Sequence, residues 1–325
     1  MKDKIAFIGS GKVSKFHIEA ALEAGFTVTA ISATDKSKSA LELSKQYAIA
    51  NYFERTEELL RSNLYDCISV VTPPDISVKL IGLISKKNVP ALIEKPGALD
   101  SVSLNEYTQI KNIFVAYNRR YYNTIDDLKS ISSQNPGVFQ FSVIEFAGLY
   151  SDVFLDIKDA ILNNSVHMLD LLTYLIGKCD LRDPVYSEIN HNLNCRVFHA
   201  DCYVGNFNLS FNSKKNTSIE FENSDLNVKI SPIERLQKFD SFKIIPPEPN
   251  YTYTKYRTVF GKLTESMEII ESGNLKPGFL GQYLDFYQFC NSGVKPKKLA
   301  SLADAEKVLK LAEFIVGLYR LHLKN

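Results

Sequence analysis

Two glycines near the amino terminus have the spacing of a turn that binds a phosphate group. The apolar run Lys4–Ile8 leads into the loop Gly9–Ser14, where a helical pattern begins. Gly9 permits a tight turn, Gly11 lets the backbone approach a pyrophosphate, and the start of the helix supplies free N–H groups. The small Ser14 stands where this pattern usually has a third glycine, and the loop as a whole predicts dinucleotide binding. The contacts are expected from Gly9, Ser10, Gly11, Lys12 and Val13.

The end of the second predicted strand should distinguish two dinucleotides. An acidic residue there holds the ribose 2′-hydroxyl of NAD, whereas an arginine meets the 2′-phosphate of NADP. The expected position is near Ala33, which carries no charge. Asp35 could serve NAD or only cap the next helix, whereas Ser32, Thr34 and two nearby lysines could serve NADP. The sequence therefore leaves NAD and NADP open, with contacts expected from Ser32, Ala33 and Thr34.

A lysine follows the fifth predicted strand, within Glu94-Lys95-Pro96. This place is the carboxyl edge of a parallel sheet, where open α/β sheets bind their ligands. The Lys95 ammonium can donate a hydrogen bond to a reacting oxygen and stabilise a developing alkoxide. The alternative is a solvated lysine after a strand, and the flanking Glu94 and Pro96 favour the functional interpretation.

His167 lies in an apolar helical pattern, Ser165–Leu175. Its imidazole titrates near neutrality and can shuttle a proton. Between Val166 and Met168, the residue taken alone is better explained as part of a core. The other histidines and the five scattered cysteines lack the spacing of metal ligands, so we expect no metal site.

The first 120 residues alternate between short apolar strands and helical patterns, which predicts an α/β domain with a doubly wound parallel sheet. The predicted strands are Lys4–Ile8, Thr27–Ser32, Ala50–Phe53, Cys67–Val71, Ala91–Glu94 and Ile113–Tyr117. Helices are expected after the glycine loop and near Ser37–Gln46, Glu57–Arg61, Ile76–Lys86 and Ser101–Ile110.

Residues 121–325 have a different pattern, which predicts an α+β domain with a largely antiparallel open sheet. Val138–Phe146 alternates between apolar and polar residues, as a strand with one covered face does. Further strands are expected at Arg196–His199, Tyr203–Phe211, Thr217–Glu222 and Leu226–Ile230. The predicted closing helices, Gly281–Cys290 and Leu302–Leu323, could pack back on the first domain. Residues 246–250 predict a rigid proline-rich loop.

Composition excludes several classes of protein. The 325 residues carry 38 Lys and Arg against 37 Asp and Glu, so no cationic field attracts nucleic acid or an anionic membrane. No stretch approaches the roughly 18 apolar residues of a membrane span. The cysteines are odd in number and scattered, which favours reduced thiols and a cytoplasmic location.

Several segments together resemble the Gfo/Idh/MocA family, the relatives of glucose–fructose oxidoreductase and inositol dehydrogenase. They are Thr72-Pro73-Pro74, Glu94-Lys95-Pro96, Tyr117–Tyr122, the segment Asn163–Asp170 around His167, and His17. The resemblance spans the whole chain and implies a Rossmann domain, a C-terminal open-sheet domain and a tightly bound NAD or NADP. It also implies hydride exchange with sugar or cyclitol carbons, and a homodimer or homotetramer.

The resemblance assigns roles to residues of this chain. Lys95 and His167 become the catalytic pair, and Thr72, Pro73, Glu94 and Asn118 join the cofactor contacts. Substrate contacts are expected from Lys95, Arg120, Tyr122, Asn163 and His167. For Arg120 an inter-domain salt bridge is an equal alternative, and we expect His17 to pack helix against sheet.

One position departs from the family pattern, which commonly has an Asp four residues before the histidine. Here that residue is Asn163, which can hydrogen-bond a substrate hydroxyl but cannot act as a base. The leading hypothesis is an NAD(P)-dependent oxidoreductase of a sugar, cyclitol or nucleotide sugar, with a possible place in surface-polysaccharide synthesis. The alternatives are a non-catalytic NAD(P)-binding sensor, for which Asn163 leaves room, and a redox-assisted glycosidase.

Overall fold

The computed structural model describes residues 2–33, 37–145, 157–211, 213–245, 258–268 and 275–323. The chain groups into two compact units. The first comprises Met1–Tyr121, Phe154–Tyr174 and Glu271–Asn325, and the second comprises Tyr122–Val153 and Leu175–Ile270. The boundary predicted near residue 120 lies where the chain first passes from the first unit to the second, between Tyr121 and Tyr122. The two closing helices, α9 (Phe279–Ser292) and α10 (Leu302–Leu323), belong to the first unit.

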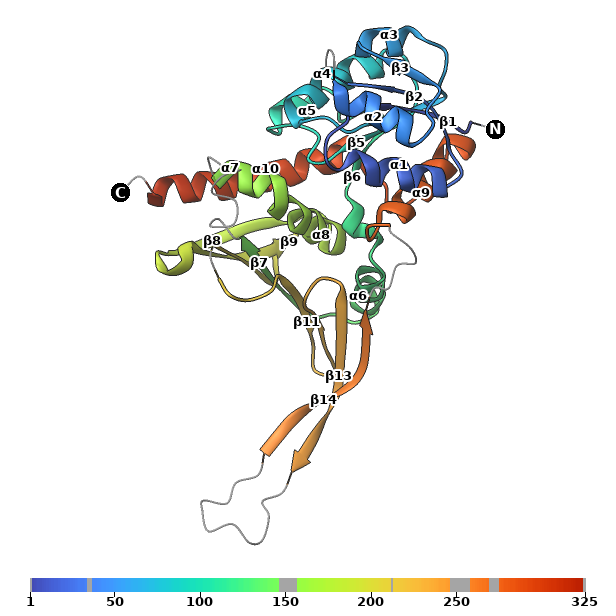
Figure 1. Cartoon of the computed structure of the whole chain (residues 1–325). Coiled ribbons are helices and arrows are strands. Elements are labelled where there is room, and N and C mark those ends of the chain that lie inside the picture. The colour runs from blue at the N-terminus through green and yellow to red at the C-terminus, as the bar shows by residue number, and fades with distance from the viewer. Residues whose placement is uncertain are drawn as a thin grey trace. The chain divides into compact units, whose positions relative to one another are not determined.

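The first unit contains a seven-stranded sheet in the order β15-β6-β5-β4-β1-β2-β3 (Figure 1). Its strands are β1 (Lys4–Ile8), β2 (Thr27–Ser32), β3 (Asn51–Phe53), β4 (Cys67–Val70), β5 (Ala91–Glu94), β6 (Ile113–Ala116) and β15 (Ala300–Ser301). The pairs from β6 to β3 are parallel, and the short β15 adds to β6 antiparallel. This order confirms the predicted doubly wound sheet. The strand order reverses at β1, since β2 and β3 follow on one side of it and β4 to β6 on the other. Open α/β sheets bind their ligands at such a switch point.

Helices follow the strands of the first unit where the sequence predicts them. They are α1 (Ser14–Glu23), α2 (Lys38–Gln46), α3 (Thr56–Arg61), α4 (Pro74–Ser85) and α5 (Val102–Asn105). Ser37 caps α2 by accepting a hydrogen bond from the Ala40 N–H at 3.4 Å. The helix expected over Ser101–Ile110 is shorter, because the Tyr107 and Thr108 N–H groups bond three residues back in turns.

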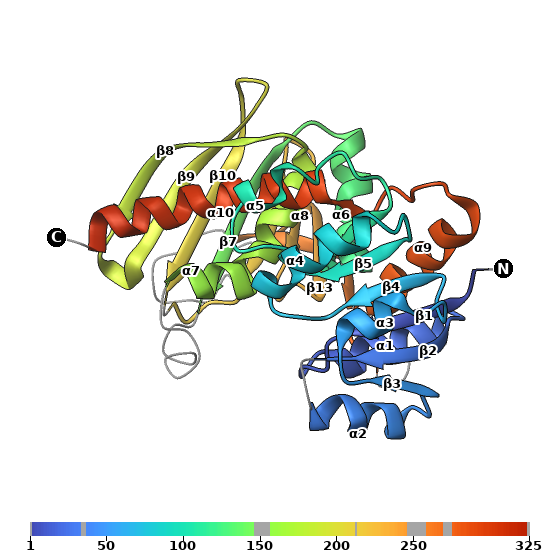
Figure 2. The same cartoon turned by 90° about the horizontal axis from the view of Figure 1, so that it is seen from above.

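The closing helices complete the core of the first unit. In Figure 1, α9 lies beside α1, and its Tyr283 and Phe286 join Phe7 and Phe114 in one buried cluster. Figure 2 shows α10 passing α5, with which it is in contact. The apolar face that the sequence predicts on α10 is buried from Leu302 to Tyr319. Among the described residues, no helix is long and apolar enough to cross a membrane.

Short helical elements of the first unit supply further site residues. They are the 3-10 helix η1 (Asn118–Tyr121), α7 (Ile157–Ala160), the π-helical turn η3 (Ile161–Ser165) and the start of α8 (Val166–Ile176). The π-helical turn directly precedes α8, so Asn163 lies in a stretch of backbone wider than an α-helix. Such π-bulges are frequent at functional sites.

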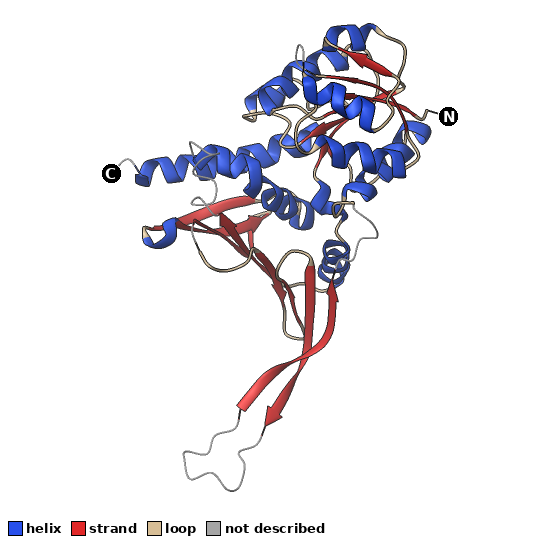
Figure 3. Cartoon of the chain, viewed as in Figure 1, coloured by secondary structure: helices blue, strands red, loops and turns tan. Residues whose placement is uncertain are grey.

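The strands of the second unit, which are red in Figure 3, form one sheet. This sheet has eight strands in the order β14-β13-β12-β11-β7-β10-β9-β8. Its strands are β7 (Val138–Glu145), β8 (Asp180–Ser187), β9 (Asn192–His199), β10 (Cys202–Phe211), β11 (Ser218–Glu222), β12 (Asn227–Ile230), β13 (Arg235–Ile245) and β14 (Thr258–Glu268). All recorded pairs are antiparallel except β7 with β10. The expected largely antiparallel sheet is confirmed. The helix α6 (Asn123–Gln134) and the 3-10 turn η4 (Ile189–His191) also belong to this unit.

The sequence does not predict β8, β13, β14 or α6. In β13 the apolar residues Leu236, Phe239 and Phe242 are three apart, whereas a strand alternates every two residues. The structure resolves this conflict with register shifts on both sides of Phe239. The proline-rich loop 246–250 and the aromatic stretch 251–257 lie outside the described residues.

Candidate active site

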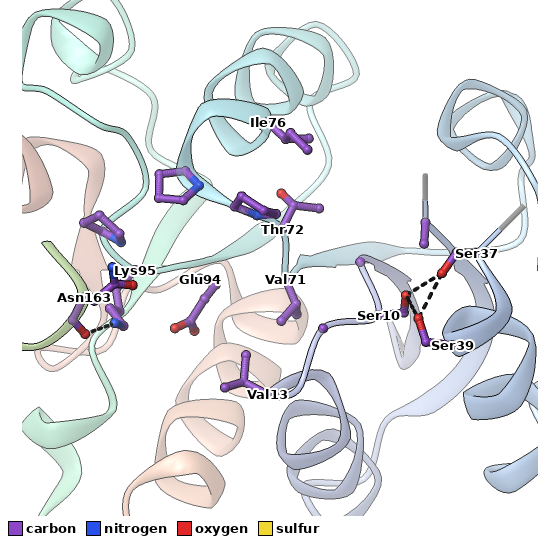
Figure 4. Close-up of a pocket in the computed structure, with 16 residues that line it drawn as sticks. Ser10, Val13, Ser37, Ser39, Val71, Thr72, Ile76, Glu94, Lys95 and Asn163 are labelled. Atoms are coloured by element: carbon purple, nitrogen blue, oxygen red, sulfur yellow. Dashed lines mark hydrogen bonds between the residues drawn. The ribbon is translucent and has the colours of Figure 1, made fainter. Parts of the chain in front are cut away.

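A cavity of about 530 Å³ lies at the carboxyl ends of β1, β4 and β5 in the first unit (Figure 4). The predicted residues that line it are Gly9, Ser10, Gly11, Val13, Ala33, Thr72, Pro73, Glu94, Lys95 and Asn163. Other lining residues that the sequence did not single out include Ser37, Ser39, Val71 and Ile76. The fold therefore brings the glycine loop and the lysine turn to one cavity, although 86 positions separate Gly9 from Lys95 (95 − 9 = 86).

The glycine loop has the geometry of a phosphate-binding turn. Gly9 has φ +112°, and an added Cβ would lie 2.1 Å from the Val71 carbonyl oxygen, so only glycine fits. An added Cβ at Gly11 would meet nothing within 4 Å, so the backbone there borders open space that a pyrophosphate can approach. The first turn of α1 carries no acidic residue that would oppose an anion. These residues fit a bound dinucleotide. Lys12 is exposed but is not part of the cavity lining.

Three hydroxyl groups form a triangle at one end of the cavity. Ser10 Oγ lies 3.1 Å from Ser37 Oγ and 2.8 Å from Ser39 Oγ, and the last two are 2.9 Å apart (Figure 4). Ser32 is buried and is not among the lining residues, Ala33 lines the wall, and Thr34 lies outside the described residues. The sequence places Ser37 at the start of a predicted helix and does not indicate its place in the cavity.

The opposite end of the cavity contains the lysine turn. Lys95 Nζ donates a hydrogen bond to the backbone oxygen of Asn163 at 2.5 Å (Figure 4). The Asn163 side chain points back along its own helix and donates from Nδ2 to the Asp159 oxygen at 2.8 Å. The π-helical turn thus presents a main-chain acceptor to the ammonium. Thr72, on the neighbouring loop, is held by a 2.9 Å hydrogen bond between its hydroxyl and that of Ser77.

His167 lies one turn beyond Asn163, at the start of α8. Its ring is half-buried, and Nδ1 is buried without a hydrogen-bond partner among the described residues. Burial lowers the pKa of His167 well below its usual value, and the positive charges of Arg119 and Lys95 lower it further. The imidazole is therefore uncharged at neutral pH, with a nitrogen available to accept a proton.

His167 is not among the residues that line the cavity, and three other predicted contacts also lie away from the lining. Arg120 is 4% exposed and its guanidinium makes paired hydrogen bonds to Asp170 at 2.6 to 3.1 Å. Of the two alternatives for Arg120, this geometry favours the salt bridge, which lies within the first unit. Asn118 donates to the Pro277 oxygen at 2.9 Å, and Tyr122 begins the second unit as a buried residue.

Comparison with known proteins finds a match to the first part of the chain. A family model described as an oxidoreductase family with an NAD-binding Rossmann fold, Gfo/Idh/MocA, matches residues 4–124. No curated protein sequence matches the chain significantly.

Solved structures share the fold at low sequence identity. An oxidoreductase from Thermotoga maritima has a TM-score of 0.74 at 20% identity, over 97% of this chain and 96% of that one. The UDP-N-acetylglucosamine 3-dehydrogenase of Acidithiobacillus ferrooxidans has a TM-score of 0.72 at 16% identity, over 96% of both chains.

A third structure carries a cofactor. This oxidoreductase from Agrobacterium radiobacter, in complex with NAD⁺, L-tartaric acid and magnesium, has a TM-score of 0.75 at 18% identity, over 96% of this chain and 95% of that one. The match to residues 4–124 confirms the resemblance seen in the sequence and the expected nicotinamide dinucleotide. Residues 4–124 thus match the NAD-binding Rossmann domain of the Gfo/Idh/MocA oxidoreductase family.

Proposed function

We propose that this protein transfers hydride between a nicotinamide dinucleotide and a hydroxyl-bearing carbon of a sugar, cyclitol or nucleotide sugar. One observation carries the proposal: the Lys95 ammonium borders the cavity of the glycine turn and donates to the backbone oxygen of Asn163, one turn before His167. An ammonium and an uncharged imidazole near one cavity are the two groups that oxidation of an alcohol requires from the protein.

Each residue has a separate task in the proposed reaction. When bound, the dinucleotide supplies the hydride acceptor, held by the glycine turn and the wall formed by Ala33, Thr72 and Pro73. Lys95 donates a hydrogen bond to the substrate oxygen and stabilises the negative charge that develops as hydride leaves the same carbon. The neutral His167 accepts the hydroxyl proton. In the reverse direction His167 returns this proton to the carbonyl oxygen, while Lys95 stabilises the negative charge that develops there.

Lys95 suits this task because it lines the cavity and a main-chain oxygen helps to orient its side chain. The Asn163 carbonyl accepts one of the three ammonium hydrogens and so orients the side chain. A carbonyl is a neutral acceptor, so it orients the ammonium without neutralising its charge.

The substrate class is supported by a solved structure of the same fold. The protein from Acidithiobacillus ferrooxidans is named a UDP-N-acetylglucosamine 3-dehydrogenase, and UDP-N-acetylglucosamine is a nucleotide sugar. We propose the same broad class here, with a place in the synthesis of surface-polysaccharide sugars. A cytoplasmic location and a homodimer or homotetramer are further parts of the proposal, which cell fractionation and light scattering would test.

A panel of free sugars, cyclitols and nucleotide sugars tests the activity directly. The purified protein should change absorbance at the nicotinamide band with at least one member, using NAD⁺ or NADP⁺. The variant Gly11→Val should bind neither nucleotide, because its side chain fills the open space beside the backbone while leaving the fold intact. Turnover by Gly11→Val equal to that of the wild type would contradict the proposed cofactor site.

A non-catalytic sensor is the second candidate, favoured by Asn163 where the family commonly has an aspartate. Such a protein would bind the dinucleotide with the same glycine turn. It would leave the absorbance of the nicotinamide unchanged with every substrate of the panel. Binding measured by calorimetry together with no turnover would select this candidate over the enzyme.

A further inference from the structure

A chain of buried polar groups runs from the centre of the first unit to the wall of the cavity. His17, on α1, is 1% exposed. Its Nε2 lies 3.0 Å from Glu94 Oε2, and its Nδ1 lies 3.0 Å from the hydroxyl of Tyr283 on α9. That hydroxyl lies 2.7 Å from Ser69 Oγ on β4. The residues come from four elements, and 266 positions separate His17 from Tyr283.

The hydrogen bonds of this chain have a fixed direction when the imidazole is neutral. A carboxylate only accepts, so His17 Nε2 carries the proton and Nδ1 accepts from Tyr283. Burial raises the pKa of Tyr283 well above its usual value, so its hydroxyl keeps the proton that it donates. Ser69 in turn donates to the tyrosine oxygen. One tautomer of His17 therefore satisfies both ring nitrogens.

Packing holds the imidazole in place between these partners. The His17 ring lies edge-on to Phe279, with 4.9 Å between ring centroids, and edge-on to the Tyr283 ring at 5.8 Å. The ring is thus fixed by apolar contacts and by hydrogen bonds on both sides, as a buried polar group requires.

Glu94 is the point at which this chain reaches the cavity. Its side chain is 16% exposed and lines the cavity next to Lys95 (Figure 4). Within the described part of the chain, His17 is the recorded hydrogen-bond partner of the carboxylate, through Oε2. A hydrogen-bond network that only stabilised the core would not need to extend to a residue of the cavity wall.

We propose that His17 and Tyr283 are positioning residues for the dinucleotide, acting through Glu94. They hold one carboxylate oxygen, so that the other accepts a hydrogen bond from a donor on the nicotinamide half of the cofactor. The serine triangle and the glycine turn border the far part of the cavity, and Glu94 borders the part with Lys95. This inference rests on the proposed function, since it requires that the cavity bind a nicotinamide dinucleotide.

Two substitutions of His17 separate positioning from packing. His17→Gln retains an amide N–H near the place of Nε2, whereas His17→Asn retains a polar group only near Nδ1. Both lose the ring contact with Phe279 and should lower the thermal midpoint alike. Dissociation constants for NADH and NADPH, measured by calorimetry on nucleotide-free protein, should differ: about tenfold weaker for His17→Asn and within about threefold of wild type for His17→Gln.

A double-mutant cycle with Glu94→Gln tests whether the effect passes through the carboxylate. Glu94→Gln alone should weaken nucleotide binding about tenfold, and adding His17→Asn should weaken it no further. Equal affinities of the two His17 variants, or fully additive losses in the cycle, would overturn the positioning role.

Tyr283→Phe keeps the test decisive if the His17 variants do not fold. It removes only the hydroxyl and keeps the ring against Phe26 and His17. We expect binding about threefold weaker, with no further loss in the Glu94→Gln background. Unchanged affinity of Tyr283→Phe would overturn the inference while leaving the proposed function intact. Failure of the wild type to bind either nucleotide would instead overturn the proposed function itself.

Discussion

Lys95 and Arg120 are both cations that follow parallel strands of the same sheet, yet their surroundings differ. Lys95 borders a cavity and donates to a neutral main-chain oxygen. Arg120 is buried, pairs with Asp170 on two atoms and has Asp304 at 3.9 Å. Burial opposes the charge of Arg120, but the Asp170 charge and hydrogen bonds outweigh it and raise the pKa of the guanidinium.

The difference shows how a structural cation is told from a functional one. Carboxylates neutralise the charge of Arg120. The aromatic rings of Tyr117 and Tyr174 lie near its guanidinium group. Removal of Arg120 would take from the buried Asp170 the guanidinium that pairs with it. Lys95 instead lines the cavity, and the recorded acceptor of its ammonium is a main-chain oxygen.

Removing the Lys95 ammonium should have the largest effect on activity. We expect Lys95→Ala to lower kcat by ~10²–10⁴-fold, because the group that hydrogen-bonds the reacting oxygen and stabilises its developing negative charge is lost. The dissociation constant of the dinucleotide and the thermal midpoint should stay close to wild type. Steady-state kinetics measure kcat, and calorimetry measures the dissociation constant and the thermal midpoint. Near-normal turnover would remove Lys95 from the mechanism and erase its contrast with Arg120.

Removing the Arg120 guanidinium should act on stability. Arg120→Met removes the guanidinium that pairs with the buried Asp170 and should lower the free energy of unfolding by about 3–5 kcal/mol. The neighbouring Arg119→Met is a matched control, because Arg119 makes one 3.5 Å hydrogen bond, to Asn164, from a half-buried position. The Arg119→Met substitution should lower the free energy of unfolding by less than about 1 kcal/mol. Denaturant unfolding of both variants measures these two losses of free energy. Equal losses would contradict a special role of Arg120.

The lowered pKa of His167 gives a dependence on pH with a defined sign. The folded protein holds the ring neutral, whereas the unfolded chain takes up a proton as pH falls through about 6.5. Stability from this group is therefore full above pH ~6.5 and is lost as pH falls below it, by at most about 1.4 kcal/mol per pH unit.

His167→Asn removes this titration, so its thermal midpoint should fall less than that of wild type between pH 7 and 5. Melting curves across this range measure the difference. The same variant should lower kcat at neutral pH about 10²-fold or more, as expected for a lost proton acceptor. Parallel melting profiles of the two proteins would show that the ring is not held neutral.

Asn163 offers the smallest expected effect. Asn163→Ala keeps the backbone oxygen that accepts from Lys95, so kcat should stay within about twofold of wild type. KM should rise about threefold to tenfold if the amide binds a substrate hydroxyl. Steady-state kinetics on the substrate found in the panel would check this. A large fall in kcat would show that the side chain, rather than the main chain, acts with Lys95.

The sequence predicts much of the first unit, because short apolar strands and amphipathic helices carry their own periodicity. It also predicts the glycine loop and the lysine turn, since both depend on local geometry at strand ends. It does not predict β13, whose bulges break the two-residue alternation. It treats His17 as a packing residue, because its partners Glu94 and Tyr283 are 77 and 266 positions away.

The amino-acid sequence by itself determined the order of strands and helices in the first unit, the turn at Gly9 and the place of Lys95 after a strand. These follow from interactions between residues close together in the chain. Only the tertiary structure decided which cation is neutralised, which carbonyl holds Lys95 and which groups connect Glu94 to the core. Hydrogen bonds and ion pairs between distant residues have no signature in local sequence, because they depend on where the packed core places each side chain.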